Sequence, residues 1–301
     1  MITPNNFMTS VELAALMYDR YGLTYDSYDL EYPRIFGSSI PTSKAYEEHV
    51  GMSGFNLIPE KGIGINVSYA DPKQGFKGRI NQTVYGLGFA VAKEMFLWEQ
   101  WRLIEALPKA LANSVQETRE TLAILTLDRA FNSSYSGADG KELCATDHVR
   151  ESDGAAWKNE PSSAMDLNFE GWEQALIDIA SYTSPSGLKI KSKPRLLATG
   201  VNNNRMCAEL FGSQKKPDTA NNEANYAYNA VPYMISHYLT STKSWFILLE
   251  GDNGLVNFTS RKPDFTQDNE FNSEVARFKV VFNEAFSWED PRRIYGSPGV
   301  S

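Results

Sequence analysis

Residues 107–131 carry the apolar stripe of one unusually long amphipathic helix. Its members recur at steps of three and four residues, the spacing of a single helix face: Leu107, Leu111, Val115, Thr118, Leu122 and Leu125. Pro108 is predicted to lie in the first turn, where its missing N–H is harmless. About 25 residues at 1.5 Å each make a helix of roughly 37 Å. A helix of this length is expected to act as a strut across the whole molecule.

Residues 64–91 have the pattern of a long antiparallel hairpin, yet this hairpin has no evident core of its own to lie on. A loose bend around Asp71, Pro72 and Gly75 separates two alternating runs: Ile65, Val67 and Tyr69, then Tyr85, Leu87, Phe89 and Val91. Periodicity leaves two interpretations open. The ribbon either joins an ordinary sheet of its own domain or packs on another chain.

The N-terminal region combines a short helix with a tyrosine-rich arm. Residues 11–18 predict the helix, and residues 19–39 are rich in tyrosine and acidic residues and are closed by Pro33 and Gly37. This composition predicts an extended arm that lies across another surface, because tyrosine offers contact area with a polar tip. An irregular loop on its own domain is the alternative.

The rest of the chain mixes helices and strands. Residues 168–183 predict a helix that Asn168 caps, with one apolar side made by Phe169, Trp172, Leu176 and Ile179. Asp139-Gly140 marks a turn that leads into a short hairpin. A helix ending at Gly212 and five strand-like segments complete the series, the strands at 194–200, 233–239, 244–251, 254–262 and 274–288. The expected fold class is α+β.

Composition argues against several functions. The formal net charge of −8 argues against a basic surface that grips nucleic acid or anionic lipid, because such affinity comes from Lys and Arg on phosphate. No stretch reaches 18 uninterrupted apolar residues, so no membrane helix is predicted, and the N-terminal residues do not resemble a signal peptide. Two cysteines imply no disulfide framework and fit a reducing cytoplasm.

No motif for catalysis or for a cofactor stands out. The two Gly-x-Gly pairs, at Gly62 and at Gly86, both lack the third glycine of a phosphate loop. Cys144 and His148 have no second pair of ligands for zinc, so we interpret them as a core thiol and a hydrogen-bonded imidazole. Asp147 and His148 are the one arguable general-base pair. We expect no enzyme, no cofactor and no metal.

The order of these features resembles the major capsid proteins of tailed bacteriophages, which have the Hong Kong 97-like capsid fold. Five segments carry the resemblance: 31–55 as the entry from arm to hairpin, 66–95 as the extended loop, 110–131 as the spine helix, 137–148 as the turn after it, and 261–299 as the closing strand and tail. Each motif is weak singly, and their order is the specific part.

The resemblance implies a division into parts. The expected division is an N-terminal arm at 1–55, an extended loop hairpin at 56–92, a peripheral domain with the spine helix at 93–193, an axial domain at 194–270, and a return strand with the tail at 271–301. In this family the hairpin lies over a neighbouring subunit, so the missing packing partner would be another copy. The expected inter-subunit residues are Tyr69, Lys73, Phe76, Lys77, Arg79 and Tyr85 of the loop and Tyr25, Tyr28, Tyr32, Arg34 and Phe36 of the arm.

The implied function is self-assembly into the icosahedral shell that encloses the phage double-stranded DNA. Pentamers and hexamers of the chain would form in the bacterial host cytoplasm, and the DNA would be enclosed without specific binding. Scaffolding, portal and decoration proteins are further candidate partners, with no membrane. Three alternatives stay open: a nanocompartment shell that encloses enzyme cargo, a soluble α/β enzyme, and a decoration or tail adhesin protein.

Overall fold

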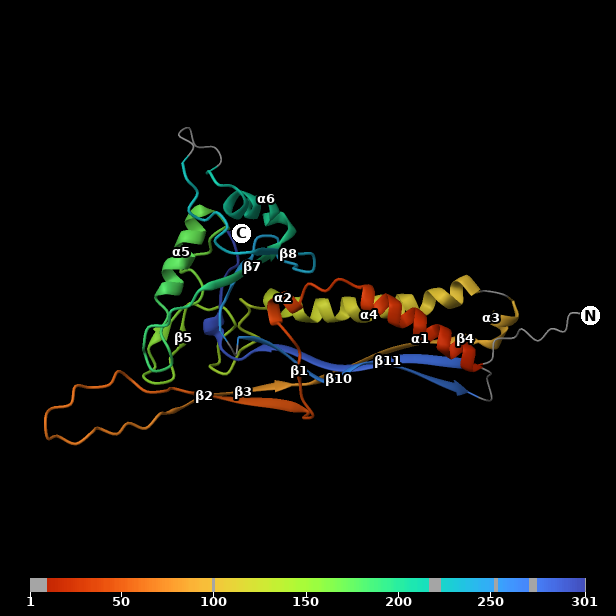
Figure 1. Cartoon of the computed structure of the whole chain (residues 1–301), viewed down its shortest axis with the longest axis horizontal. Helices are drawn as coiled ribbons and strands as arrows, with labels where there is room; N and C mark the ends of the chain where they lie inside the picture. Colours follow the sequence, from red (N-terminus) through yellow and green to blue (C-terminus); the bar gives the residue numbers. More distant parts are fainter. Residues whose placement is uncertain (1–9, 99–100, 217–222, 252–253, 271–274, 301) are drawn as a thin grey trace, which may run out of the picture.

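The computed structural model describes residues 10–98, 101–216, 223–251, 254–270 and 275–300. A long helix lies along a long four-stranded sheet, a smaller α/β unit stands at one end of both, and a hairpin projects beyond that end (Figure 1). Among the described residues no helix is long and apolar enough to cross a membrane.

The long helix is α4, Trp101–Asp128. It begins before the predicted start at Leu107, so Pro108 lies inside the helix and its predicted place in the first turn is wrong. Proline removes one hydrogen bond from the helix interior. Apolar packing continues on both sides of it, because Ile104 and Leu111 are buried in the same cluster. This packing holds the helix together across the missing bond.

The long sheet has the strand order β1-β10-β11-β4, with β1 at Ile40–Pro41, β10 at Leu255–Glu270, β11 at Val275–Trp288 and β4 at Thr83–Ala92. β10 and β11 form an antiparallel pair, and β4 pairs antiparallel with β11. Helix α1, Ser10–Ser27, packs against α4, and both cover one face of the sheet through residues such as Met17, Tyr21 and Val115. Helix α3, Lys93–Leu97, follows β4.

The smaller unit contains a second four-stranded sheet, in the order β12-β9-β7-β8. Its strands are β7 at Pro194–Gly200, β8 at Tyr233–Ser236, β9 at Trp245–Leu249 and β12 at Ile294–Ser297. Helix α5, Phe169–Ala180, packs on this sheet, and Trp172, Trp245 and Tyr295 are almost completely buried between them. The predicted capping by Asn168 is confirmed, since its side chain accepts a hydrogen bond from the Gly171 N–H at 2.7 Å.

Two short stretches complete this unit. Residues 201–212 are helical as predicted, in three pieces: Val201–Asn203, α6 at Asn204–Cys207 and Ala208–Gly212. The predicted turn with Gly140 precedes a short hairpin of β5, His148–Val149, and β6, Ala156–Trp157. His148 Nδ1 lies 2.6 Å from an Asp139 carboxylate oxygen and Nε2 lies 3.1 Å from Asn159 Oδ1. Cys144 is fully buried. The interpretations of Cys144 as a core thiol and of His148 as a hydrogen-bonded imidazole are therefore confirmed.

The strand pairing predicted for residues 64–91 is wrong. The projecting hairpin is made by β2, Tyr46–Met52, and β3, Gln74–Asn81. Residues 65–69 are not in a strand, and β4 pairs with β11 instead. The physical reason is that β4 buries Val91 and packs Phe89 against α4 and the long sheet, and residues 65–69 offer no such core.

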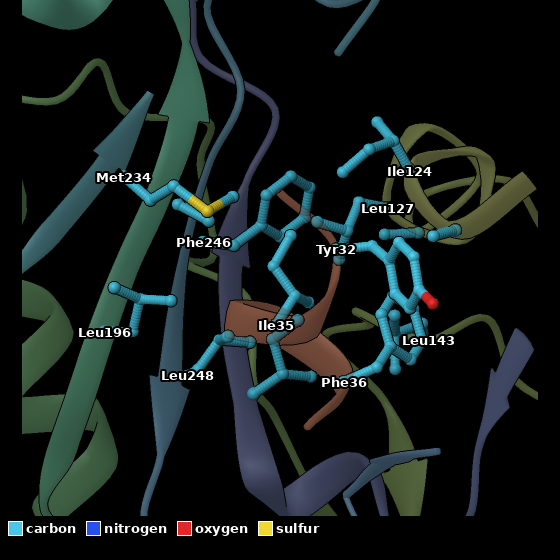
Figure 2. Packing of buried hydrophobic residues seen from close by; sticks show 14 of the residues in the cluster. Tyr32, Ile35, Phe36, Ile124, Leu127, Leu143, Leu196, Met234, Phe246 and Leu248 are labelled. Carbon is cyan, nitrogen blue, oxygen red and sulfur yellow. The ribbon is translucent and has the colours of Figure 1, made fainter. Parts of the chain in front are cut away.

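The arm is also more ordered than predicted. Helix α1 continues to Ser27, and α2, Pro33–Phe36, forms a single turn. Tyr32, Ile35 and Phe36 are buried among side chains of α4, β7, β8 and β9 (Figure 2). Segment 28–36 therefore joins the long helix to the smaller sheet, and the prediction of an extended arm without a packed element is wrong there.

Candidate inter-subunit surface

The hairpin of β2 and β3 is closed where the chain passes Ser53 and Lys73. The Ser53 N–H donates to the Lys73 carbonyl oxygen, and the Lys73 N–H donates to Ser53 Oγ, both at 2.9 Å. Lys73 Nζ also donates to the Ser152 carbonyl oxygen at 3.0 Å, which ties the loop end of the hairpin to the rest of the chain. Beyond this point residues 54–72 form no strand.

Side chains along the hairpin hold its two strands together. The imidazole of His49 lies directly over Gly78, whose register partner it is. Lys77 pairs with Glu48 at 3.1 Å, and the Arg79 guanidinium lies 3.6 Å from the centre of the Tyr46 ring. These contacts make the hairpin a defined support for the side chains of its loop, residues 54–72.

The loop carries a set of apolar side chains without any core to enter. We call them the apolar tip: Phe55, Leu57, Ile58, Ile63, Ile65, Val67 and Tyr69. Ile58 is 94%, Ile63 107% and Tyr69 96% exposed. Large apolar side chains gathered on one exposed loop are typical of an interaction site. The tip lies at the end of the projecting hairpin, away from both sheets (Figure 1).

Of the predicted loop residues, only Tyr69 lies on the apolar tip. Lys73 is where the loop begins, at the closed end of the hairpin, and Lys77 and Arg79 lie exposed on β3 with partners in β2. Phe76 is half-buried beside a cavity of about 280 Å³ under the hairpin. Tyr85 packs in the core of the chain, with its ring stacked on Phe282 at 5.3 Å. The structure therefore does not bring these six residues into one surface.

The predicted arm residues mostly contact their own chain. Tyr32 and Phe36 are buried in the cluster shown in Figure 2, so their side chains offer no free surface, against the expectation for them. The Tyr25 hydroxyl accepts a hydrogen bond from Arg119 at 2.9 Å, and the Tyr28 hydroxyl lies 2.5 Å from that of Tyr238. Arg34 is exposed and donates to the Tyr233 carbonyl oxygen at 3.4 Å.

A buried carboxylate on α4 holds this arm in place. Glu120 accepts hydrogen bonds from the backbone N–H of Glu31 at 2.5 Å and of Tyr32 at 3.1 Å, and its residue is completely buried. Burial raises the pKa of Glu120 to about 7, against the lowering effect of the two N–H donors. Burial likewise raises the pKa of Tyr32 to about 12. The arm is therefore anchored through an ionisable group.

Sequence reasoning missed four members of the apolar tip: Phe55, Leu57, Ile58 and Ile63. The available signal was composition, because residues 55–65 carry five large apolar side chains, with Pro59 and three glycines nearby and no strand or helix period. A loop is normally polar, so an aperiodic apolar loop indicates contact with another molecule.

The residues that line the cavity under the hairpin include His49, Trp157, Glu151 and Arg292, and Arg292 pairs with Glu151 at 2.9 Å. In the described ranges no three His, Cys, Asp or Glu residues lie together as a metal site would need. The features that stand out are a projecting support and an apolar surface.

Comparison with known proteins agrees with this architecture. The family model described as phage capsid protein matches residues 78–297. No curated protein matches the sequence.

Solved structures of low sequence identity share the fold. The capsid of bacteriophage JBD30, decorated with minor capsid protein trimers, is 15% identical with a TM-score of 0.56, over 71% of this chain and 92% of that one. The mature capsid of bacteriophage PhiM1 is 7% identical with a TM-score of 0.55, over 89% and 86% of the two chains. The virus-like particle from Pyrococcus furiosus is 9% identical with a TM-score of 0.51, over 94% and 98%.

The family match decides among the alternatives left by the sequence. It covers the long helix, α5, the second sheet and all of the long sheet except β1, which is nearly three quarters of the chain. It describes a phage capsid protein, so a nanocompartment shell is not favoured, and the protein is structural and not an enzyme. The chain belongs to the phage capsid protein family and is a major capsid protein with the Hong Kong 97-like fold.

Proposed function

We propose that the apolar tip lies on a neighbouring copy in the shell, so that the hairpin straps one subunit to the next. The observation that carries this proposal is the almost complete exposure of Ile58, Ile63 and Tyr69 on a support that points away from the protomer's own cores. Burying one such side chain stabilises an interface by about 1.5–3 kcal/mol. A closed lattice repeats the contact at every subunit, so that modest contacts sum to a stable shell.

The copies assemble as pentamers and hexamers in this proposal. The unit around β7, β8, β9 and β12 is the axial part that approaches the local symmetry axis, and α4 with the long sheet is the peripheral part. The burial of α5 against β7 and β9 supports placing α5 with the axial part, which moves the expected boundary at residue 194 towards the N-terminus.

Charged residues around the hairpin and arm form the rim of this contact. Lys73, Lys77, Arg79 and Arg34 are exposed, and polar rims commonly surround apolar interface centres. Tyr25 and Tyr28 contribute to the proposed contact indirectly, because they hold the arm segment in place.

The acidic balance of the chain suits an inner wall that encloses double-stranded DNA without binding it. A net charge of −8 repels phosphate, so packaged DNA can slide. Assembly takes place in the bacterial host cytoplasm, and scaffolding, portal and decoration proteins are the further partners of the shell.

The tip is tested by replacing two of its most exposed residues with lysine. We expect the Ile58→Lys/Ile63→Lys variant to remain unassembled while the wild type forms particles of megadalton size, measured by light scattering and electron microscopy. The matched control is Ile177→Lys, which charges a 58% exposed isoleucine on α5. Thermal unfolding of unassembled protomers should be unchanged in both variants. Normal shells from the tip variant would refute the strap.

A further inference from the structure

The long sheet has two edges of different character. At its β10 edge, β1 covers only Phe258 and Thr259. Beyond them β10 carries register shifts around Arg261 and a proline at Pro263. Four charged residues lie exposed along the same stretch: Arg261, Lys262, Asp264 and Asp268. Charges, proline and bulges are devices that keep an edge strand from pairing with another chain.

The β4 edge has none of these devices. Its ten residues, Thr83–Ala92, contain no charge and no proline, and their register with β11 is unbroken. Within the described part of the chain no other strand pairs with β4, and no backbone hydrogen bond joins it to a loop. Val84 is 65% and Leu87 58% exposed. Half of the N–H and C=O groups of such an edge point outward without a ladder partner.

A second segment with the pattern of a strand but no strand partner lies on the apolar tip. Residues 65–70 alternate Ile65, Val67 and Tyr69 with small or polar residues, and residues 62–70 contain no charge. The alternation predicts a strand, yet in the protomer residues 65–70 have no ladder. Among these residues the Ile65 N–H donates to the Gly62 carbonyl oxygen at 3.2 Å, in a turn.

We infer that residues 65–70 of one copy add as a strand to the β4 edge of a neighbouring copy. The inference rests on the proposed strap and names the surface that receives it. Pairing within one chain is unavailable, because the tip projects from one end of the protomer while β4 runs towards the other end (Figure 1). The two strands predicted as one hairpin in residues 64–91 then pair with each other, but across two copies of the chain.

Charge favours β4 over β10 as the receiving edge. An uncharged strand on an uncharged edge removes no ion from water, whereas the β10 edge would place four charged residues beside it. Main-chain bonds of an added strand supply affinity, and pockets for alternate side chains supply specificity.

Cysteine cross-linking tests the pairing between copies. Val67→Cys is combined in turn with Val84→Cys, Leu87→Cys and Ala90→Cys, and assembled particles are oxidised mildly and run on non-reducing gels. The native Cys144 and Cys207 are buried and do not compete. We expect covalent ladders with at least one β4 partner and none with the matched control Val67→Cys/Gln267→Cys, which places the thiol on the exposed part of β10. No ladder with any β4 partner, or an equal ladder with Gln267→Cys, would overturn the inference.

Hydrogen exchange on the wild-type protein gives a second readout without any substitution. Backbone amides of residues 65–70 and outward amides of β4 should exchange at least tenfold more slowly in shells than in unassembled protomers. Fast exchange of residues 65–70 in intact shells refutes strand pairing. If this fast exchange is seen and the Ile58→Lys/Ile63→Lys variant also fails to assemble, the strap stands and only its receiving edge is wrong. Normal assembly of that variant instead refutes the strap itself.

Discussion

Arg119 of α4 and Glu284 of β11 form a buried ion pair through two nitrogens of the guanidinium. Arg119 Nη2 donates to Glu284 Oε1 at 2.7 Å and Arg119 Nε donates to Oε2 at 3.0 Å. The same guanidinium donates to the Tyr25 hydroxyl, so one side chain joins the long helix, the long sheet and the arm.

Breaking this pair on one side should destabilise the protomer strongly. We expect Arg119→Met to lower the free energy of unfolding by about 3–5 kcal/mol, because Glu284 is left buried without its partner. The double variant Arg119→Met/Glu284→Leu should lose clearly less free energy of unfolding, since it removes both charges. The control Arg261→Met breaks an exposed pair with Asp264 and should cost at most about 1 kcal/mol. Urea unfolding of unassembled protomers measures all three, and a cost below about 1 kcal/mol for Arg119→Met contradicts the argument.

Protonation of Glu120 should make the anchoring of the arm depend on pH. The pKa of Glu120 is raised by burial from 4.5 to about 7, so folding favours the protonated carboxyl. The resulting stabilisation is fully present below about pH 4.5 and is lost as the pH rises through about 7. The free energy of unfolding falls by about 3 kcal/mol at most over this range. The neighbouring charges that act on it are Glu31 and Arg119. We expect residues 28–36 to exchange amide hydrogens faster at pH 8 than at pH 6, after correction for intrinsic rates.

Glu120→Gln removes this titration while it keeps an oxygen that accepts the two backbone N–H groups. The pH dependence at residues 28–36 should disappear in this variant. Burial also raises the pKa of Glu160 to about 7, beside Glu142 and His148, so Glu160→Gln is the matched control. That control should leave the pH dependence of residues 28–36 intact. An unchanged dependence in Glu120→Gln would show that another group controls the arm.

Gly78 is required by the imidazole that lies on it. A Cβ at residue 78 would lie 2.1 Å from His49 Cε1, so Gly78→Ala forces the ring to move. We expect faster hydrogen exchange in β2 and β3 and a weaker support for the apolar tip. Gly86→Ala is the control, because its Cβ would meet no atom closer than 3.4 Å. Equal exchange in the hairpin of both variants would disprove the role of the Gly78 contact.

The cap of α5 offers a test on the smaller unit. Asn168→Ala removes the acceptor of the Gly171 N–H and should lower the free energy of unfolding by about 1 kcal/mol. Asn113→Ala, on the exposed face of α4, should change it by no more than about 0.5 kcal/mol. Chemical denaturation of both variants compares them directly, and equal values would argue against the cap.

Local patterns in the sequence determined the type of most elements. The cap at Asn168 and the apolar side of α5 predicted that helix, and the β-rich segments at 194–200 and 274–288 predicted β7 and β11. The order of these elements also indicated the capsid family. These features could be predicted because hydrogen-bonded caps and apolar periods act between residues close in the chain.

Only the tertiary structure decided which strands pair and which side chains are free. The alternation at 85–91 fits a partner at 65–69 as well as it fits β11, and packing of Phe89 and Val91 under α4 selects β11. In the same way Tyr32 and Phe36 are suited by composition to any apolar surface, and they enter the core of their own chain. Strand partners and burial depend on contacts between residues distant in sequence, and a local pattern cannot choose among partners that satisfy the same period.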